Sequence, residues 1–266
     1  MYLYFDCHNC KEDEYKKRKS NIVYYVSANI VNDDGYFEFT CPNNHRNRVI
    51  LIAPKFDILF MIGENAVLDG YFREAISSFH TSLERAYEEY IRFMGFLDKI
   101  PESVSDKTWK HLVKQSERQF GAFTVLWLTK HKEDPKTLPE KYITLRNNVI
   151  HNGYLPSMQQ TIEFGKSIIE VIEPIFKEVV KHELFYKYLD SKIHLEKYVK
   201  SEGSLTRLHI MTGIRKKVES NEDFEKHLDT VNVFKQMDKR DHFNLITDPS
   251  NPKGFYKTTV VTYGSK

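Results

Sequence analysis

The sequence predicts a mainly α protein, in which an antiparallel helical bundle is preceded by a small β module. From residue 54 onward, apolar residues recur at three- and four-residue spacings, which is the period of an amphipathic helix. Before residue 54, short aromatic and β-branched runs stand between turn residues, a pattern typical of strands. We therefore expect three consecutive segments: a β module over 1–53, a helical bundle over 54–200 and a C-terminal extension of uncertain fold over 201–266.

Four main helices are expected in the bundle. One apolar stripe predicts a long helix over 72–94, and a second aromatic-rich stripe predicts a single helix over 106–130. A shorter helix over 140–150 follows a proline-containing loop. The fourth helix should begin near Ser157, a suitable N-cap, and Pro174 inside it should kink or split it.

Composition limits the classes of function. The chain has 266 residues, of which 41% are hydrophobic, so it is not a disordered protein. Its formal net charge of +2 means that RNA binding would depend on local basic patches and not on a global field. We find no apolar run long enough to span a bilayer and no secretory signal pattern, which predicts a cytoplasmic protein without a membrane partner.

All three cysteines lie in the first 41 residues, and their spacing suggests a metal site. Cys7 and Cys10 form one Cys-x-x-Cys pair, while Cys41 and His45 form a second pair that follows a strand-like run. These four residues offer the sulfur and nitrogen ligands that tetrahedral zinc prefers, and a closed set of four indicates a structural ion. Two alternatives remain open: buried cysteines without a metal, or His8 in place of His45.

Arg146 and His151 are the candidate catalytic pair. Arginine stays charged at physiological pH and histidine exchanges a proton near neutrality, which is what acid/base chemistry on a phosphate requires. On a continuous helix their side chains would point about 140° apart. The helix must therefore break between them, or a second chain must complete the site. A surface arginine and a helix-terminal histidine would give the same spacing.

The stretch 145–153, together with the amphipathic stretch 70–85, resembles the HEPN superfamily, in which an Arg-x(4–6)-His pattern marks ribonucleases. The resemblance implies a helical bundle, a homodimer with its site across the interface, and RNA as substrate. It also implies a metal-independent endoribonuclease of toxin or defence type, in which a ribose 2′-hydroxyl attacks phosphorus and leaves a cyclic phosphate. His151 would then transfer protons, Arg146 would hold the phosphate, and Asn147 would orient substrate or histidine.

The chain also departs from the family pattern. Leu145 stands where some members carry a lysine, and Glu140 is one place out of register for their acidic residue. Glu84 is a candidate for that supporting role, whereas Arg85 is expected to be a surface charge. Two further functions therefore remain open beside the nuclease: a non-catalytic RNA- or protein-binding sensor dimer, and an enzyme whose metal is catalytic. A regulatory protein partner is a further option.

Overall fold

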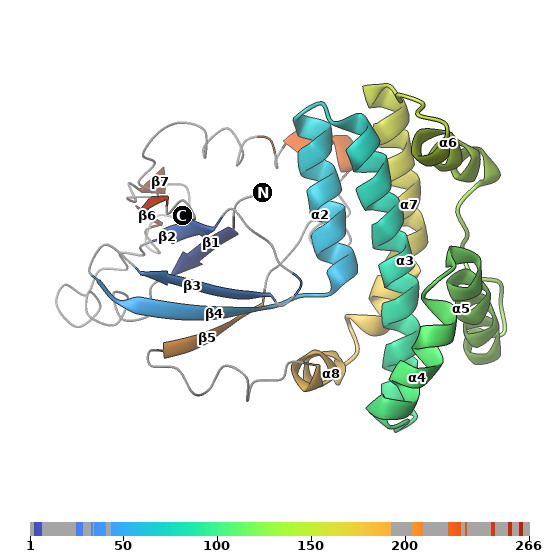
Figure 1. Ribbon diagram of the computed structural model, residues 1–266, viewed down its shortest axis with the longest axis horizontal. Helices are drawn as coiled ribbons and strands as arrows, with labels where there is room; N and C mark the ends of the chain where they lie inside the picture. The colour runs from blue at the N-terminus through green and yellow to red at the C-terminus, as the bar shows by residue number, and fades with distance from the viewer. Residues whose placement is uncertain are drawn as a thin grey trace. The chain divides into compact units, whose positions relative to one another are not determined.

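The computed structural model describes residues 3–6, 25–28, 33, 35–40, 44–192, 204–209, 223–229, 232, 246–247, 255–256 and 261–262. The structure is mainly helical, and the chain divides into two compact units (Figure 1). One unit contains the strands and combines three separate parts of the chain: Met1–Ile52, His194–Ile210 and Asn232–Lys266. The other contains the helices and comprises Ala53–Ile193 and Met211–Val231. Each unit therefore combines residues from more than one of the three consecutive segments expected from the sequence.

The strands form small sheets within the first unit. In one sheet, β3 (Tyr36–Thr40) pairs antiparallel with β4 (Arg46–Ile52), and β4 pairs in parallel with β5 (Ser204–His209). A parallel pair needs a long connection, and the whole of α2 to α8 lies between β4 and β5 in the sequence. The remaining strands are β1 (Leu3–Asp6), β2 (Tyr25–Ala28) and β8 (Val261–Thr262) in a second sheet, and β6 (Ile246–Thr247) with β7 (Phe255–Tyr256) in a third.

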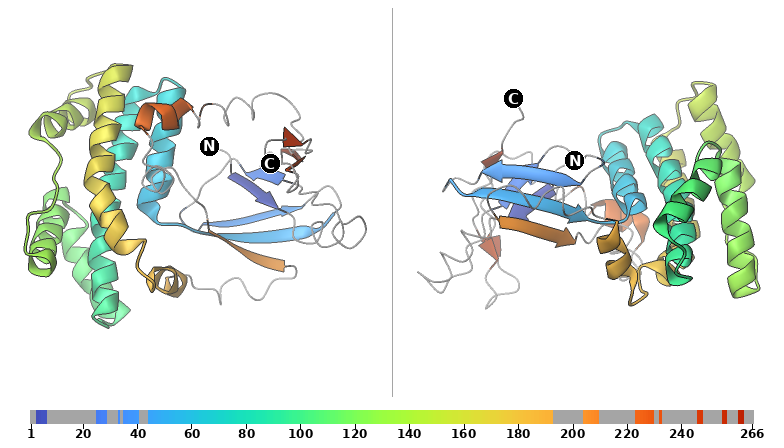
Figure 2. Two further views of the ribbon diagram at one scale, coloured as in Figure 1. Left: turned by 180° about the vertical axis from the view of Figure 1, so that it is seen from behind. Right: turned by 60° about the horizontal axis from the view of Figure 1, so that its bottom comes forward.

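The second unit is built around one long helix, α3. Besides a short helical segment over residues 224–229, its helices are α2 (Lys55–Leu68), α3 (Phe72–Leu97), α4 (Glu102–Leu112), α5 (Ser116–His131), α6 (Glu140–His151), α7 (Met158–Val179) and α8 (Phe185–Ser191). α3 contacts each of the other six, and Figures 1 and 2 show α2, α3 and α7 side by side. The predicted stripe of α3 is buried, which confirms the helical period; its buried members include Ile76, Phe79, Leu83, Ala86, Tyr90 and Met94. No helix of the described residues is long and apolar enough to cross a membrane.

Two glycines allow α2 and α7 to approach Phe79 of α3. A Cβ atom at Gly63 would lie 2.5 Å from ring carbons of Phe79. A Cβ atom at Gly165 would lie 2.9 Å from the ring of Phe224 and 3.1 Å from that of Phe79. The distances of 2.5 Å at Gly63 and 2.9 Å at Gly165 are too short for a side chain, so the aromatic core of this unit depends on glycine at these positions.

The expected single helix over 106–130 is wrong, because α4 and α5 are separate helices. Between them Gln115 adopts an extended backbone with φ −141° and ψ 125°. The side-chain amide of Gln119 in α5 donates to the carbonyl of Val113 at 3.1 Å and satisfies the open end of α4. The interruption is short enough that apolar residues on both sides still fit one helical period, which is why the pattern conceals the break.

The last long helix begins where the sequence predicts. Ser157 is the N-cap of α7, its hydroxyl accepts from the Gln160 backbone N–H at 3.2 Å, and the Gln160 side chain accepts from the Ser157 backbone N–H at 2.9 Å. Pro174 lies within α7 and does not split it. α6 likewise begins at Glu140, as expected. The candidate motif around Arg146 therefore lies on α6, a helix that begins at the residue the sequence predicts.

Candidate functional site

Arg146 and His151 both belong to α6, which runs without interruption from Glu140 to His151. The helix ends after the histidine: the Asn152 and Tyr154 backbone N–H groups both donate to the Asn148 carbonyl, at 3.0 and 3.1 Å. Gly153 follows in the left-handed region with φ 69°. The alternative of a helix break between Arg146 and His151 is therefore wrong. On this continuous helix the two side chains leave the axis about 140° apart.

Arg146 points toward α3. Its side chain is 22% exposed, and its Nη2 atom lies 3.8 Å from Oε1 of Glu84. Nη1 donates to Oδ1 of the neighbouring Asn147 at 2.9 Å. The Nε atom is buried and has no hydrogen-bond partner among the described residues. The guanidinium is thus held from two sides, by Glu84 and by Asn147.

Glu84 lies between two basic groups. Its Oε1 atom is 3.4 Å from Nδ1 of His80, one helical turn earlier on α3. Burial raises the pKa of the Glu84 carboxyl, while the nearby charges of Arg146 and Arg85 lower it. Burial, followed by the charge of Arg146, lowers the pKa of His80 to about 3. His80 is therefore neutral near pH 7.

The sequence indicated Glu84 as an acidic candidate but did not indicate His80. The usable signal was the spacing of four residues between them, which puts both on one face of a helix. That signal is weak in a chain with 11 histidines and 37 acidic residues. Only the packing of α6 across α3 shows that this face is the one that meets Arg146.

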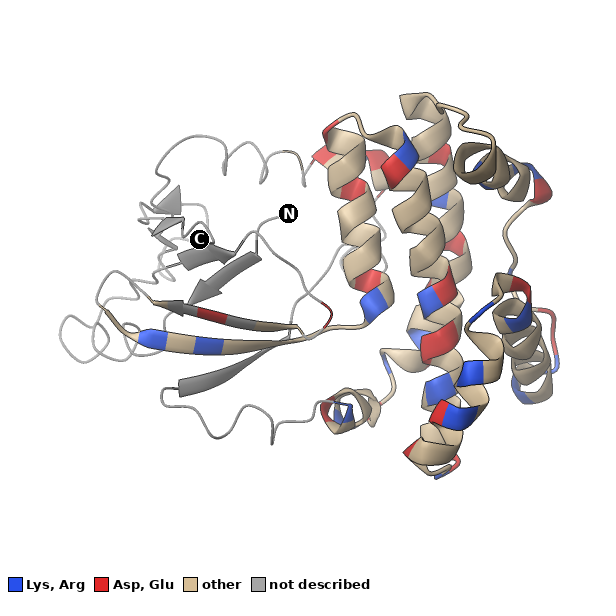
Figure 3. Ribbon diagram, in the orientation of Figure 1, with Lys and Arg blue, Asp and Glu red and all other residues tan. Residues whose placement is uncertain are grey.

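Arg85 is not the surface charge expected from the sequence. Its side chain is 20% exposed, and Nη1 donates to Oε2 of Glu88 at 2.6 Å. Nη2 donates to Oε1 of Gln119 in α5 at 3.0 Å, and the guanidinium lies 5.9 Å from the centre of the Trp109 ring. Arg85 therefore ties α3 to α4 and α5. Figure 3 shows residues of both charge signs along α3, as such pairings require.

His151 and Asn147 lie on the exposed side of α6. The turn after His151 also exposes apolar surface, since the side chain of Leu155 is 77% exposed and that of Tyr154 is 44% exposed. Within one chain, the structure thus brings Asn147 to Arg146 but leaves His151 on a different side of the helix. A single chain therefore does not assemble the expected catalytic pair.

The expected zinc ligands are described only in part. Cys7, Cys10 and Cys41 lie outside the described residues, as does the alternative ligand His8. His45 precedes β4, and its backbone carbonyl accepts from Nδ2 of Asn47 at 2.8 Å. Within the part of the chain that the structure describes, no cluster of three histidine, cysteine or acidic residues could hold a metal ion. The zinc site stays a prediction.

Comparisons with protein families, with curated proteins and with solved structures give no match to this chain. The likeness to the HEPN superfamily therefore remains a resemblance carried by the motif around Arg146.

Proposed function

We propose that this protein is a metal-independent endoribonuclease that acts as a homodimer. The observation that carries the proposal is the state of Arg146. Its guanidinium is half-buried, is anchored near Glu84 and keeps a buried Nε donor without a partner among the described residues. His151 is exposed five residues later on the same helix. A fixed cation and a proton-transfer group, brought together from two chains, are the set that phosphoryl transfer from a 2′-hydroxyl needs.

The reaction proceeds by proton transfer and in-line attack. One His151 imidazole accepts the proton of a ribose 2′-hydroxyl, and the resulting oxygen nucleophile attacks the adjacent phosphorus. The bond from phosphorus to the 5′-oxygen breaks, and a second imidazole protonates that leaving oxygen. The products are a 2′,3′-cyclic phosphate and a 5′-hydroxyl. Arg146 stabilises the charge that develops on the non-bridging oxygens through forked hydrogen bonds.

The direction of the side chains on α6 supports a site shared by two chains. Arg146 and His151 diverge on one helix, but a two-fold axis near the Asn152–Gly153 turn would bring the His151 of one chain toward the Arg146 of the other. Exposed apolar side chains near this turn and on α5 are suited to such an interface: Leu155 is 77%, Val125 65% and Leu128 49% exposed. The doubled site supplies two arginines and two histidines.

Zinc in the proposed protein is structural. Cys7, Cys10, Cys41 and His45 would form a closed set of four ligands and leave no position for a reacting water. The catalytic steps above use only arginine and histidine. Activity and metal content should therefore be separable.

The test is cleavage of a single-stranded RNA of mixed sequence by the purified full chain, with and without EDTA. Cleavage should persist in EDTA, give cyclic-phosphate ends, and be lost in both Arg146→Ala and His151→Ala. Products with 3′-hydroxyl ends, or an active His151→Ala protein, would contradict the mechanism. RNA binding without cleavage would instead favour the non-catalytic binding dimer.

A further inference from the structure

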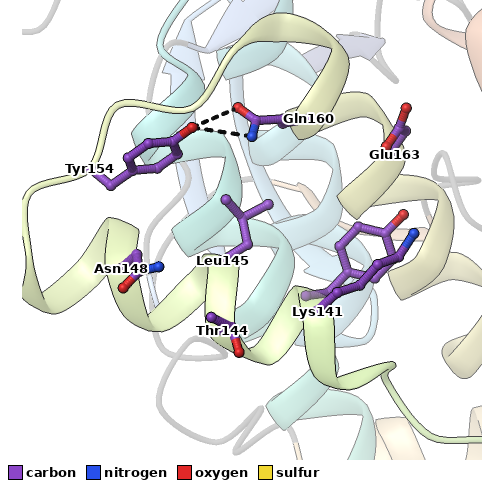
Figure 4. A pocket seen from close by; sticks show the side chains of 8 residues that line it. Lys141, Thr144, Leu145, Asn148, Tyr154, Gln160 and Glu163 are labelled. Atoms are coloured by element: carbon purple, nitrogen blue, oxygen red, sulfur yellow. Dashed lines mark hydrogen bonds between the residues drawn. The ribbon is translucent and has the colours of Figure 1, made fainter.

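A pocket of about 450 Å³ lies between α6 and α7, on the side of α6 that Arg146 does not occupy. We name it the α6–α7 pocket; the lining residues that matter here are Thr144, Leu145, Asn148, Tyr154, Gln160 and Glu163. Figure 4 shows Leu145 between the Tyr154–Gln160 pair on one side and Lys141 on the other. The volume is within the range of sites that hold small organic ligands.

His151 lies on the same stripe of α6 as this pocket. Thr144 and His151 are seven residues apart, so on the helix they point within about 20° of each other and are separated by about 10 Å along the axis. A nucleotide spans a comparable length. A group bound in the α6–α7 pocket would therefore belong to the part of a chain-like substrate next to the bond that His151 attacks.

The pocket wall is held in place before any ligand binds. The Tyr154 hydroxyl and the Gln160 side-chain amide form a hydrogen bond at 3.2 Å. Gln160 is itself fixed by the capping box with Ser157 at the start of α7. Because Tyr154 is already held in place, little ordering is needed on binding, and this residue, which is 44% exposed, offers a pre-formed surface for a flat ligand.

The charged groups of the pocket are one cation, Lys141, and one carboxylate, Glu163, so the lining carries no net positive charge that would select a phosphate. Oε1 of Glu163 accepts from Nε2 of Gln159 at 3.0 Å, and its second carboxylate oxygen can accept from an amino group of a ligand. Asn148 uses its Oδ1 to accept from Asn152 at 2.9 Å, so its Nδ2 hydrogens are oriented to donate to a ligand. An acceptor and a donor around an apolar floor of Leu145 match the edge of a base that has an amino group beside a ring nitrogen.

We propose that the α6–α7 pocket binds a nucleobase with an exocyclic amino group, next to the scissile phosphate of single-stranded RNA. In this arrangement the base packs against Tyr154, its amino group donates to Glu163, and Asn148 donates to a ring nitrogen. The pocket then gives the nuclease a preference for adenine or cytosine over uracil at one position. This inference rests on the proposed function for the identity of the substrate.

The experiment uses full-length protein with the His151→Ala substitution, so that RNA is not cut, and fluorescently labelled eight-nucleotide oligomers of adenylate, cytidylate and uridylate. Binding is measured by fluorescence anisotropy. The adenylate and cytidylate oligomers should bind more tightly than the uridylate oligomer. Adding Tyr154→Leu should weaken adenylate binding about ten-fold through loss of stacking. Adding Glu163→Leu, which removes the acceptor, should remove the preference while leaving uridylate binding unchanged.

Tyr186→Leu is the matched control, because Tyr186 has a similarly exposed side chain at 38% on α8 and should leave all three affinities unchanged. Circular dichroism of each variant shows whether it is folded. Equal binding of adenylate by the Tyr154→Leu and parent proteins, an unchanged preference in Glu163→Leu, or no binding of any oligomer would overturn the inference. Preferential binding without cleavage by the wild-type chain would refute the nuclease and leave the pocket standing. RNA cleavage by the wild-type chain, with no effect of either pocket variant on binding, would refute the role of the pocket and leave the nuclease standing.

Discussion

Nη2 of Arg146 lies 3.8 Å from Oε1 of Glu84, across the contact between α6 and α3. This relationship joins the two stretches of sequence that carry the family resemblance. It also places a carboxylate beside the guanidinium, where it can fix the direction of the arginine.

Glu84→Gln should therefore lower RNA cleavage by about ten-fold, because a less constrained guanidinium is displaced from the reacting phosphate. The measurement is kcat/KM with a short fluorescent RNA, alongside thermal unfolding. Glu170→Gln is the control, since Glu170 is 60% exposed and lies 3.7 Å from Lys136 on the surface. Full activity of Glu84→Gln would show that Arg146 needs no carboxylate beside it.

Stability should depend on His80 in acid. The ordinary pKa of histidine is 6.5, and burial lowers that of His80 to about 3. Between these values the unfolded chain binds a proton that the folded chain does not, so the free energy of unfolding should fall as pH decreases, by up to about 1.4 kcal/mol per pH unit. Glu84, with a raised pKa, acts in the opposite direction at the acidic end.

The measurement is urea unfolding of wild type and His80→Gln at several values between pH 8 and pH 4. The difference in unfolding free energy between the two proteins isolates the histidine. It should be constant above pH 7 and should shift in favour of His80→Gln as the solution is acidified. Parallel curves over the whole range would contradict a buried neutral histidine.

The helical period predicted most of the second unit because burial of an apolar face leaves a direct record in the sequence. Ile76, Phe79 and Leu83 are buried as their spacing indicates. The break between α4 and α5 left no such record, since it depends on Gln119 reaching the Val113 carbonyl. The same limit applies to the candidate site. Arg146 and His151 are visible as residue types, but their partners follow from how α6 crosses α3, and that crossing depends on packing.

Gly63→Ala should destabilise the helical unit, although alanine is the better helix former. The added Cβ atom would lie 2.5 Å from the Phe79 ring, and displacing that ring should cost about 1–3 kcal/mol. Gly95→Ala is the control, because the nearest atom to its added Cβ is 3.7 Å away. That variant should gain about 0.5–1 kcal/mol from helix propensity. Chemical denaturation measures whether the free energy of unfolding falls in Gly63→Ala and rises in Gly95→Ala. The same change in both variants would be inconsistent with this packing.

Metal content should be about one zinc ion per chain by mass spectrometry of the native protein or by elemental analysis. Cys10→Ser should lower that value and increase protease cleavage within the first 50 residues. It should leave the helical circular dichroism signal largely unchanged, because the helices belong to the other unit. Cysteine-rich segments too small for an apolar core depend on the ion for folding. A metal-free protein with an equally protease-resistant N-terminal segment would disprove the zinc site.

The shared site predicts complementation between two inactive proteins. The Arg146→Ala protein lacks the arginine and the His151→Ala protein lacks the histidine. A site formed within one chain therefore stays inactive when the two proteins are mixed. A site across a two-fold axis regains a small part of its activity, because each mixed dimer pairs the intact Arg146 of one chain with the intact His151 of the other, which acts as the base while water supplies the proton for the leaving oxygen. The dimer should also depend on Leu155, which is 77% exposed beside the turn. Leu155→Asp should therefore abolish both dimerisation in light scattering and RNA cleavage, whereas Leu184→Asp, at a leucine 38% exposed before α8, should abolish neither. A fully active monomer would refute the two-chain site, since on the unbroken α6 one chain holds its arginine and histidine in diverging directions.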